Sequence, residues 1–128
     1  MKKFGVGHDL EWVAATNLCS QGWTVTDFIT DGTWRKLDCS SVVPEEAIAI
    51  LFEIELQDDV ALSQFSLRKN GNSNIHQYLN VFTLKTHDPV FVDRICACGA
   101  NRVIEYYATN TTFTVINLEV GGWFRKRR

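Results

Sequence analysis

The chain has 128 residues, of which 45% are hydrophobic, and it carries 13 Lys and Arg against 15 Asp and Glu. This length supports one domain with a real core, and this composition excludes intrinsic disorder. We therefore predict a single domain over residues 1–128 that ends in a short basic tail at 125–128.

Charge is distributed unevenly. Lys2, Lys3 and the terminal RKRR hold six of the thirteen cations, so residues 4–124 carry seven cations against fifteen carboxylates, a net charge of −8. A nucleic-acid-binding domain shows a basic face, which this body lacks. Nucleic acid is therefore expected at the tail only. The tail could also lie on an acidic neighbour, or simply keep the C-terminus solvated.

The N-terminal segment MKKFGVGHDLEW opens with two lysines, but no apolar run of signal-peptide length follows them. No run of 18 apolar residues occurs anywhere, so we expect no membrane span. The expected place of synthesis is a cytoplasm, with no export signal.

Taken in chain order, the first candidate element is EWVAATNLC (11–19), which could form one or two helical turns, although Thr16 and Asn17 weaken it. GTWRKLDC (32–39) then predicts a short strand before Pro44. Nothing else in the chain favours a helix.

The clearest strand is EAIAILFEIELQ (46–57). Ile48, Ile50, Phe52, Ile54 and Leu56 alternate with a second set of residues that ends in two glutamates. Period two over ten residues indicates a strand with its isoleucine side in the core and its glutamates in water.

Five further segments are rich in β-branched and aromatic residues and predict strands. They are SQFSLR (63–68), HQYLNVFTLK (76–85), VFVDRICAC (90–98), RVIEYYA (102–108) and TTFTVINLEVGGWF (111–124). The segment 76–85 is apolar on both faces, so it is expected to be sandwiched or to lie at an interface. Seven or eight strands without helices predict an all-β antiparallel sandwich, with a jelly roll preferred over an immunoglobulin-like arrangement.

The stretch LRKNGNSN (67–74) lies between two of these strands, which excludes a phosphate loop before a helix. Asn70-Gly71 favours a tight type I′ hairpin turn, and the residues after it also allow a longer connection. Arg68 and Lys69 are expected to protect a strand edge from pairing.

The four cysteines are Cys19, Cys39, Cys96 and Cys98. In a chain without an export signal they are expected to be reduced, buried thiols, with Cys96 and Cys98 on one face of a strand. A disulfide that involves Cys19 or Cys39, and a metal site, are the alternatives.

Catalytic patterns are weak. Glu53 and Glu55 have a glycosidase-like spacing, but they lie on one strand and fit a solvated face better. His8-Asp9 and His87-Asp88 point in opposite directions on an extended chain. We expect no enzyme activity and no cofactor.

The four tryptophans are expected mainly to pack. Trp34 and Trp123 are the candidates for exposure, either as sugar-stacking platforms or at subunit contacts.

Three segments together resemble a group of small β-rich proteins of tailed phages, prophages and environmental sequences. They are W-x3-DCSSVVPEEA (34–47), FSLRKNGNSN (65–74) and NRVIEYYATNTTFTVINLEVGGWF (101–124). The resemblance implies a virion- or tail-associated β-sandwich that self-assembles or binds a surface.

The resemblance thus implies a structural virion protein of a head, neck, tail or fibre, assembled in the host cytoplasm, whose expected partners are itself, other virion proteins and a cell-surface glycan. A carbohydrate-binding module and a non-viral self-assembling β-protein are the alternatives. The expected partner contacts are Tyr78, Phe82, Trp123, Arg125, Lys126, Arg127 and Arg128.

Overall fold

The computed structural model describes residues 9–15 and 22–127, which form two antiparallel sheets packed face to face. The strands are Leu10–Ala14 (β1), Gly22–Thr24 (β2), Arg35–Asp38 (β3), Ala47–Gln57 (β4), Gln64–Lys69 (β5), Leu79–Phe82 (β6), Val90–Ala97 (β7), Val103–Ala108 (β8) and Val115–Lys126 (β9). Two single-turn 3₁₀ helices, Val25–Asp27 (η2) and Ile75–Gln77 (η3), complete the described elements. None of the helices in this part of the chain is long and apolar enough to cross a membrane.

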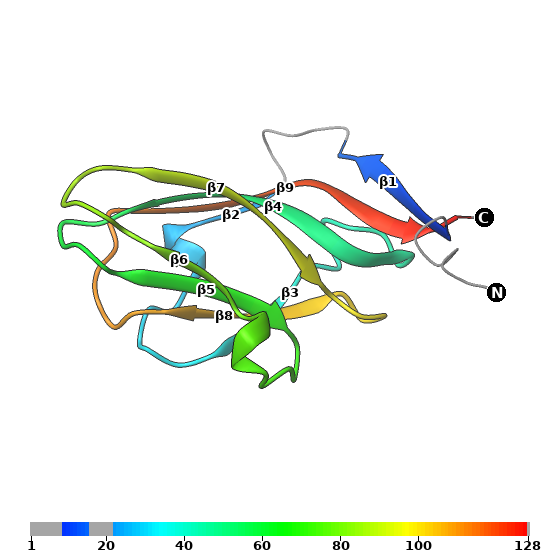
Figure 1. Ribbon diagram of the computed structural model, residues 1–128, viewed down its shortest axis with the longest axis horizontal. Helices are drawn as coiled ribbons and strands as arrows, with labels where there is room; N and C mark the ends of the chain where they lie inside the picture. The colour runs from blue at the N-terminus through cyan, green and yellow to red at the C-terminus, as the bar shows by residue number, and fades with distance from the viewer. Residues whose placement is uncertain (1–8, 16–21, 128) are drawn as a thin grey trace.

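The strand order is that of a jelly roll. The first sheet runs β1-β9-β4-β7, with β2 also on β9, and the second sheet runs β3-β8-β5-β6. β1 and β2 pair with successive parts of β9, on the edge opposite β4, so together they fill one strand position. The result is eight positions in two four-stranded sheets, as predicted. Figure 1 shows the two layers, with β9 running the length of the upper one.

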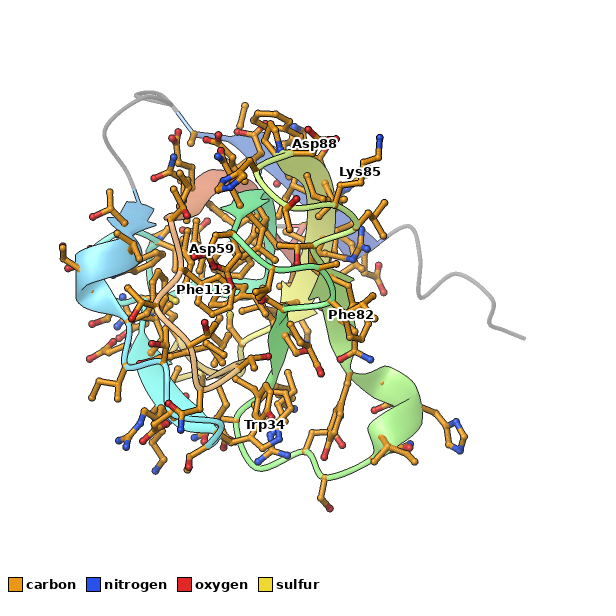
Figure 2. The ribbon with its side chains drawn as sticks, turned by 90° about the vertical axis from the view of Figure 1, so that its left-hand side faces the viewer. Trp34, Asp59, Phe82, Lys85, Asp88 and Phe113 are labelled. Carbon is orange, nitrogen blue, oxygen red and sulfur yellow. The ribbon has the colours of Figure 1, made fainter. Side chains whose placement is uncertain are left out.

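The core lies between the sheets and follows from the period-two pattern. In β4 the inward residues Ile50, Phe52, Ile54 and Leu56 are almost fully buried, each contributing about 1.5–3 kcal/mol relative to an exposed position. They meet Phe65 and Leu67 of β5, Ile104 and Tyr106 of β8, and Ile116, Leu118 and Val120 of β9. Phe113, before β9, closes the core at the end seen in Figure 2.

The expectation for Ile48 is wrong. The β4–β9 register shifts between Ala47 and Ala49, so a bulge interrupts the alternation there. Ala47 becomes the buried residue, and Ile48 is only half-buried. The other four predicted core positions of this strand are confirmed.

Three other local expectations need correction. The segment 11–19 begins as strand β1 and not as a helix, because Leu10 to Ala14 pair with β9; Thr16, Asn17 and Cys19 lie outside the described residues. The strand expected at 76–85 is confined to β6, because η3 occupies its start. Arg68 does not protect an edge, since β5 lies between β8 and β6.

The turn at Asn70-Gly71 is tight, but it is not of type I′. The amide of Asn72 donates to the carbonyl of Lys69 at 2.9 Å, and of the two central residues only Gly71 has a positive φ, of 83°. That combination makes a type II turn, whose third position needs glycine. The connection then continues through η3 to β6, so the longer of the two predicted connections is present.

Three of the cysteines are buried free thiols, as predicted. Cys39, Cys96 and Cys98 are at most 2% exposed, and Cys96 and Cys98 share the inward face. Burial raises the pKa of all three thiols, that of Cys96 to about 12. Over 9–15 and 22–127, no group of three or more His, Cys, Asp or Glu residues is placed to hold a metal ion.

Candidate functional site

The outward face of the first sheet carries a row of three carboxylates. The inward positions of β4 fill the core, so Glu53 and Glu55 point outward, as predicted for a solvated face. Glu53 lies directly opposite Asp93 of β7 and, on its other side, directly opposite Glu119 of β9. The row therefore joins three strands that are far apart in the sequence.

This row has an electrostatic cost for the isolated chain. Directly opposed residues in a sheet have Cβ atoms about 4.5–5.5 Å apart, and like charges at that separation destabilise the pair. No described Lys, Arg or His side chain forms an ion pair with Asp93, Glu53 or Glu119. The row can therefore accept a cation or hydrogen-bond donors from another molecule.

A shallow hollow of about 460 Å³ lies over this row. It is lined by Glu53, Ile54, Glu55, Phe91, Val92, Asp93, Asn117 and Glu119. The phenyl ring of Phe91 is 69% exposed, and the Asn117 side-chain amide donates to a carboxylate oxygen of Glu55 at 2.9 Å. The hollow thus combines one exposed aromatic ring with several hydrogen-bond acceptors.

Beside the acidic row, the same face becomes apolar. Leu51 of β4 lies opposite Ile95 of β7, which is 52% exposed. Further along, Trp12 of β1 pairs with Phe124 of β9, and their ring centroids are 5.2 Å apart. Trp12 is 43% exposed, so the described part of the chain leaves this band uncovered.

Close approach fixes the position of Trp12. A Cβ atom at Gly122 would lie well inside van der Waals contact of the Trp12 ring and of the Val13 carbonyl oxygen. Only a glycine at this position allows β1 and its indole to lie against β9. The band therefore depends on Gly122, the second glycine of the GG pair that precedes the last tryptophan.

The far end of the face is cationic. Lys126 pairs with Leu10 and, two residues beyond Phe124, lies on the same outward side. Arg127 follows it and is exposed, whereas Arg128 lies outside the described residues. Arg125 points the other way, where hydrogen bonds to Glu46 and Glu11 raise the pKa of its guanidinium.

The residues expected at partner contacts do not form one cluster. Tyr78 lies between η3 and β6, at the second sheet, where its hydroxyl accepts a hydrogen bond from Arg68 and its ring packs on Trp34. Phe82, on edge strand β6, is 40% exposed. Trp123 packs inward against the core, at the opposite end of β9 from the acidic row.

The prediction that Trp34 and Trp123 are the most exposed tryptophans is wrong. Trp34 lies under Arg68 and between Tyr78 and Tyr107, while Trp12 is the exposed one. Figure 2 shows Trp34 at the outer side of the second sheet. The sequence pattern placed Trp12 in a possible helix, so its outward position on a strand was not predicted.

Sequence reasoning also missed Phe91, Asp93, Asn117 and Glu119 as surface groups. The signal was present, because they are the polar or outward members of the alternating segments VFVDRIC and VINLEV. Their proximity to Glu53 depends on strand register, which a single sequence does not contain.

In comparisons with known proteins, no protein-family model matches this chain and no curated protein matches its sequence.

Proposed function

We propose that this chain is a structural subunit of a tailed-phage particle and that it works by self-assembly. The observation that carries the proposal is an uncovered apolar surface on a fully formed jelly roll. Trp12 and Ile95 are 43% and 52% exposed in the apolar band on the outer face of the first sheet, and Phe91, on the other side of the acidic row, is 69% exposed. Soluble monomers keep contiguous apolar patches small, and larger ones mark interaction sites.

A second apolar patch lies at the other sheet. Phe82 and Leu84, at the end of β6, are 40% and 71% exposed, and Leu62 is 69% exposed. The amide of Leu62 donates to the carbonyl of Thr83, so these side chains come from neighbouring segments. A subunit with two separate patches can join more than one neighbour, as a shell, ring or tube requires.

The fold and the sequence pattern support the viral part of this proposal. Jelly rolls are used by capsid proteins and by lectins, which is an argument from fold alone. The three segments that resemble phage and prophage β-proteins favour the capsid-like use. The acidic body would keep free subunits apart until the specific surfaces meet.

The test of self-assembly is the mass of the purified protein from about 1 μM to 500 μM, by light scattering coupled to size exclusion, with negative-stain imaging of the largest species. We expect oligomers that grow with concentration into rings, tubes or shells. A monomer across the whole range would overturn self-assembly. For the virion assignment, peptide mass spectrometry of particles from cells that carry the gene should find the chain in multiple copies.

Carbohydrate binding is the second candidate, and the hollow on the first sheet favours it. Sugars present hydroxyl donors and an apolar ring face, and the hollow offers carboxylates beside the exposed Phe91 ring. A glycan array with the wild type and with Phe91→Ala tests carbohydrate binding against self-assembly. Binding that Phe91→Ala abolishes, by a protein that stays monomeric, would favour the sugar site over assembly.

A further inference from the structure

The outer face of the first sheet changes character from one end to the other. It begins with the carboxylate row of Asp93, Glu53 and Glu119, continues with the apolar band, and ends at Lys126. The neighbouring row adds Glu55 beside Phe91. One face thus holds both members of a charge pair, with an uncovered apolar surface between them.

The two ends cannot neutralise each other within one chain. β9 runs continuously from Val115 to Lys126 and is paired along its length with β4 and with β1 or β2 (Figure 1). Lys126 comes seven positions after Glu119, and because the bulge in β9 absorbs one of these steps, the separation along the strand is about 20 Å. That distance is well beyond the screening length of about 8 Å at physiological salt. Over residues 9–15 and 22–127, neutralisation of one end by the other therefore requires a second molecule.

We propose that a second copy of this chain covers this face, in a twofold-symmetric dimer with β9 of one subunit antiparallel to β9 of the other. In this arrangement Lys126 lies over the partner subunit's Glu119, and Glu119 lies under the partner subunit's Lys126. The apolar bands meet between these two contacts. The inference rests on the proposed self-assembly and specifies one of its interfaces.

Charge selects this orientation over the alternative. A twofold axis parallel to the strands would place the acidic row of one copy on the acidic row of the other, and like charges across an interface cost several kcal/mol. A twofold axis perpendicular to β9, in the plane of the interface, places acid on cation at both ends. If Lys126 faces Glu119, the axis passes midway between them, between the cross-strand row of Gly122, Leu51 and Ile95 and the row of Phe124, Ala49 and Ala97.

The size of the face fits such a dimer. Twelve residues of β9 span about 37 Å, and four strand positions span about 19 Å, which gives a footprint of about 700 Å². Stable interfaces bury about 800 Å² per partner. The face is thus close to the size of a specific interface, and sheets commonly pack face to face at about 10 Å.

The first experiment is a charge exchange, read out as the dimer dissociation constant by analytical ultracentrifugation. Glu119→Lys and Lys126→Glu should each weaken dimerisation at least tenfold, because each creates two like-charge contacts. The equimolar mixture of the two variants should restore it, since both contacts are then of opposite sign. The double variant should also restore it. Lys36→Glu, at an exposed position on the second sheet, is the matched control and should leave the constant unchanged.

The second experiment places a cysteine beside the axis. Ile95→Cys should be cross-linked to its own copy by a short bismaleimide, because residues beside a twofold axis lie close to their own copies, whereas wild type and Lys36→Cys should not be cross-linked. Circular dichroism melts check that each variant is folded.

The outcomes distinguish failure of the proposed dimer interface from failure of the proposed self-assembly. If wild type assembles but the charge variants, their mixture and Ile95→Cys all behave like the controls, this interface is wrong and self-assembly stands. If wild type remains monomeric at all concentrations, both fail.

Discussion

The guanidinium of Arg68 lies over the indole of Trp34, with its Cζ atom 4.1 Å from the ring centroid. The same guanidinium pairs with Glu105 and donates to the hydroxyl of Tyr78 at 2.8 Å. The other oxygen of Glu105 accepts from the amide of Gly71 at 2.8 Å. One arginine therefore ties the outer side of the second sheet to the turn that follows β5.

The first prediction concerns this arginine. Arg68→Lys should lower the free energy of unfolding by about 2 kcal/mol, because a single ammonium cannot lie over Trp34 and also hold Glu105 and Tyr78. Urea denaturation followed by circular dichroism measures it. Arg35→Lys, in a more exposed ion pair with Asp31, is the control and should have no measurable effect. Equal effects of the two substitutions would show that the cluster contributes nothing special.

The second prediction concerns Gly122. Gly122→Ala should disturb the pairing of β1 with β9, because the new methyl group overlaps both the Trp12 ring and the Val13 carbonyl. We expect a lower melting temperature and a changed tryptophan emission. At Gly121 the nearest atom to an added Cβ is the side-chain carboxyl carbon of Glu53 at 3.2 Å, which can move. Gly121→Ala should therefore be the milder change, and the reverse order would refute the assignment of Trp12.

Local pattern determined what the sequence could predict. The β4 strand was evident because its inward residues alternate without exception from Ile50 to Leu56, and hydrophobic burial imposes that period. The burial predicted for Ile48 was wrong because a bulge arises from the pairing of two strands, which the pattern of one strand does not contain. The strand predicted at 76–85 was wrong at its start, because the Asn74 side chain accepts a hydrogen bond from the amide of His76 and η3 begins there.

The candidate site was harder to predict for the same reason. Glu53 and Glu119 are adjacent only because β4 pairs with β9 in one particular register, and shifting that register by one residue would turn Glu119 into the core. The C-terminal cations were visible in the sequence. That Arg125 is bound by Glu11 and Glu46 while Lys126 lies on the open face required the strand geometry.

The third prediction concerns the buried thiols. Burial, with a further contribution from the neighbouring thiol of Cys98, raises the pKa of Cys96 to about 12. In the unfolded chain the thiol ionises near pH 8.5 to 9, so above that range the unfolded state loses protons that the folded state keeps. The stability from these thiols is fully present below pH 9 and is lost as the pH rises toward 12.

Two measurements check this. At pH 8, iodoacetamide should modify Cys39, Cys96 and Cys98 only in denaturant, as peptide mapping would show. In urea titrations from pH 8 to 11, Cys96→Val should reduce the loss of stability with pH, because one ionising group is removed from the unfolded state. An unchanged slope would contradict the shifted pKa.

The last prediction concerns Asp58, which is fully buried where the chain leaves β4. One of its carboxylate oxygens accepts from the hydroxyl of Ser63 at 2.5 Å, and the other accepts from the amide of Asp59 at 2.8 Å. Asp58→Ala leaves both donors without their partner, which should cost about 2–4 kcal/mol of unfolding free energy. Asp58→Asn keeps an acceptor for the Asp59 amide, and its own amide can donate to the hydroxyl, so it should cost less.

A double-mutant cycle isolates the Ser63 contact. Asp58→Ala with Ser63→Ala should cost less than the sum of the two single changes, because the hydroxyl that Asp58→Ala leaves unpaired is then absent. Asp59→Ala is the control: its side chain is exposed at the end of the sandwich that Figure 2 shows, and its amide still donates to Asp58. Additive effects in the cycle would mean that Asp58 acts through packing and not through this hydrogen bond.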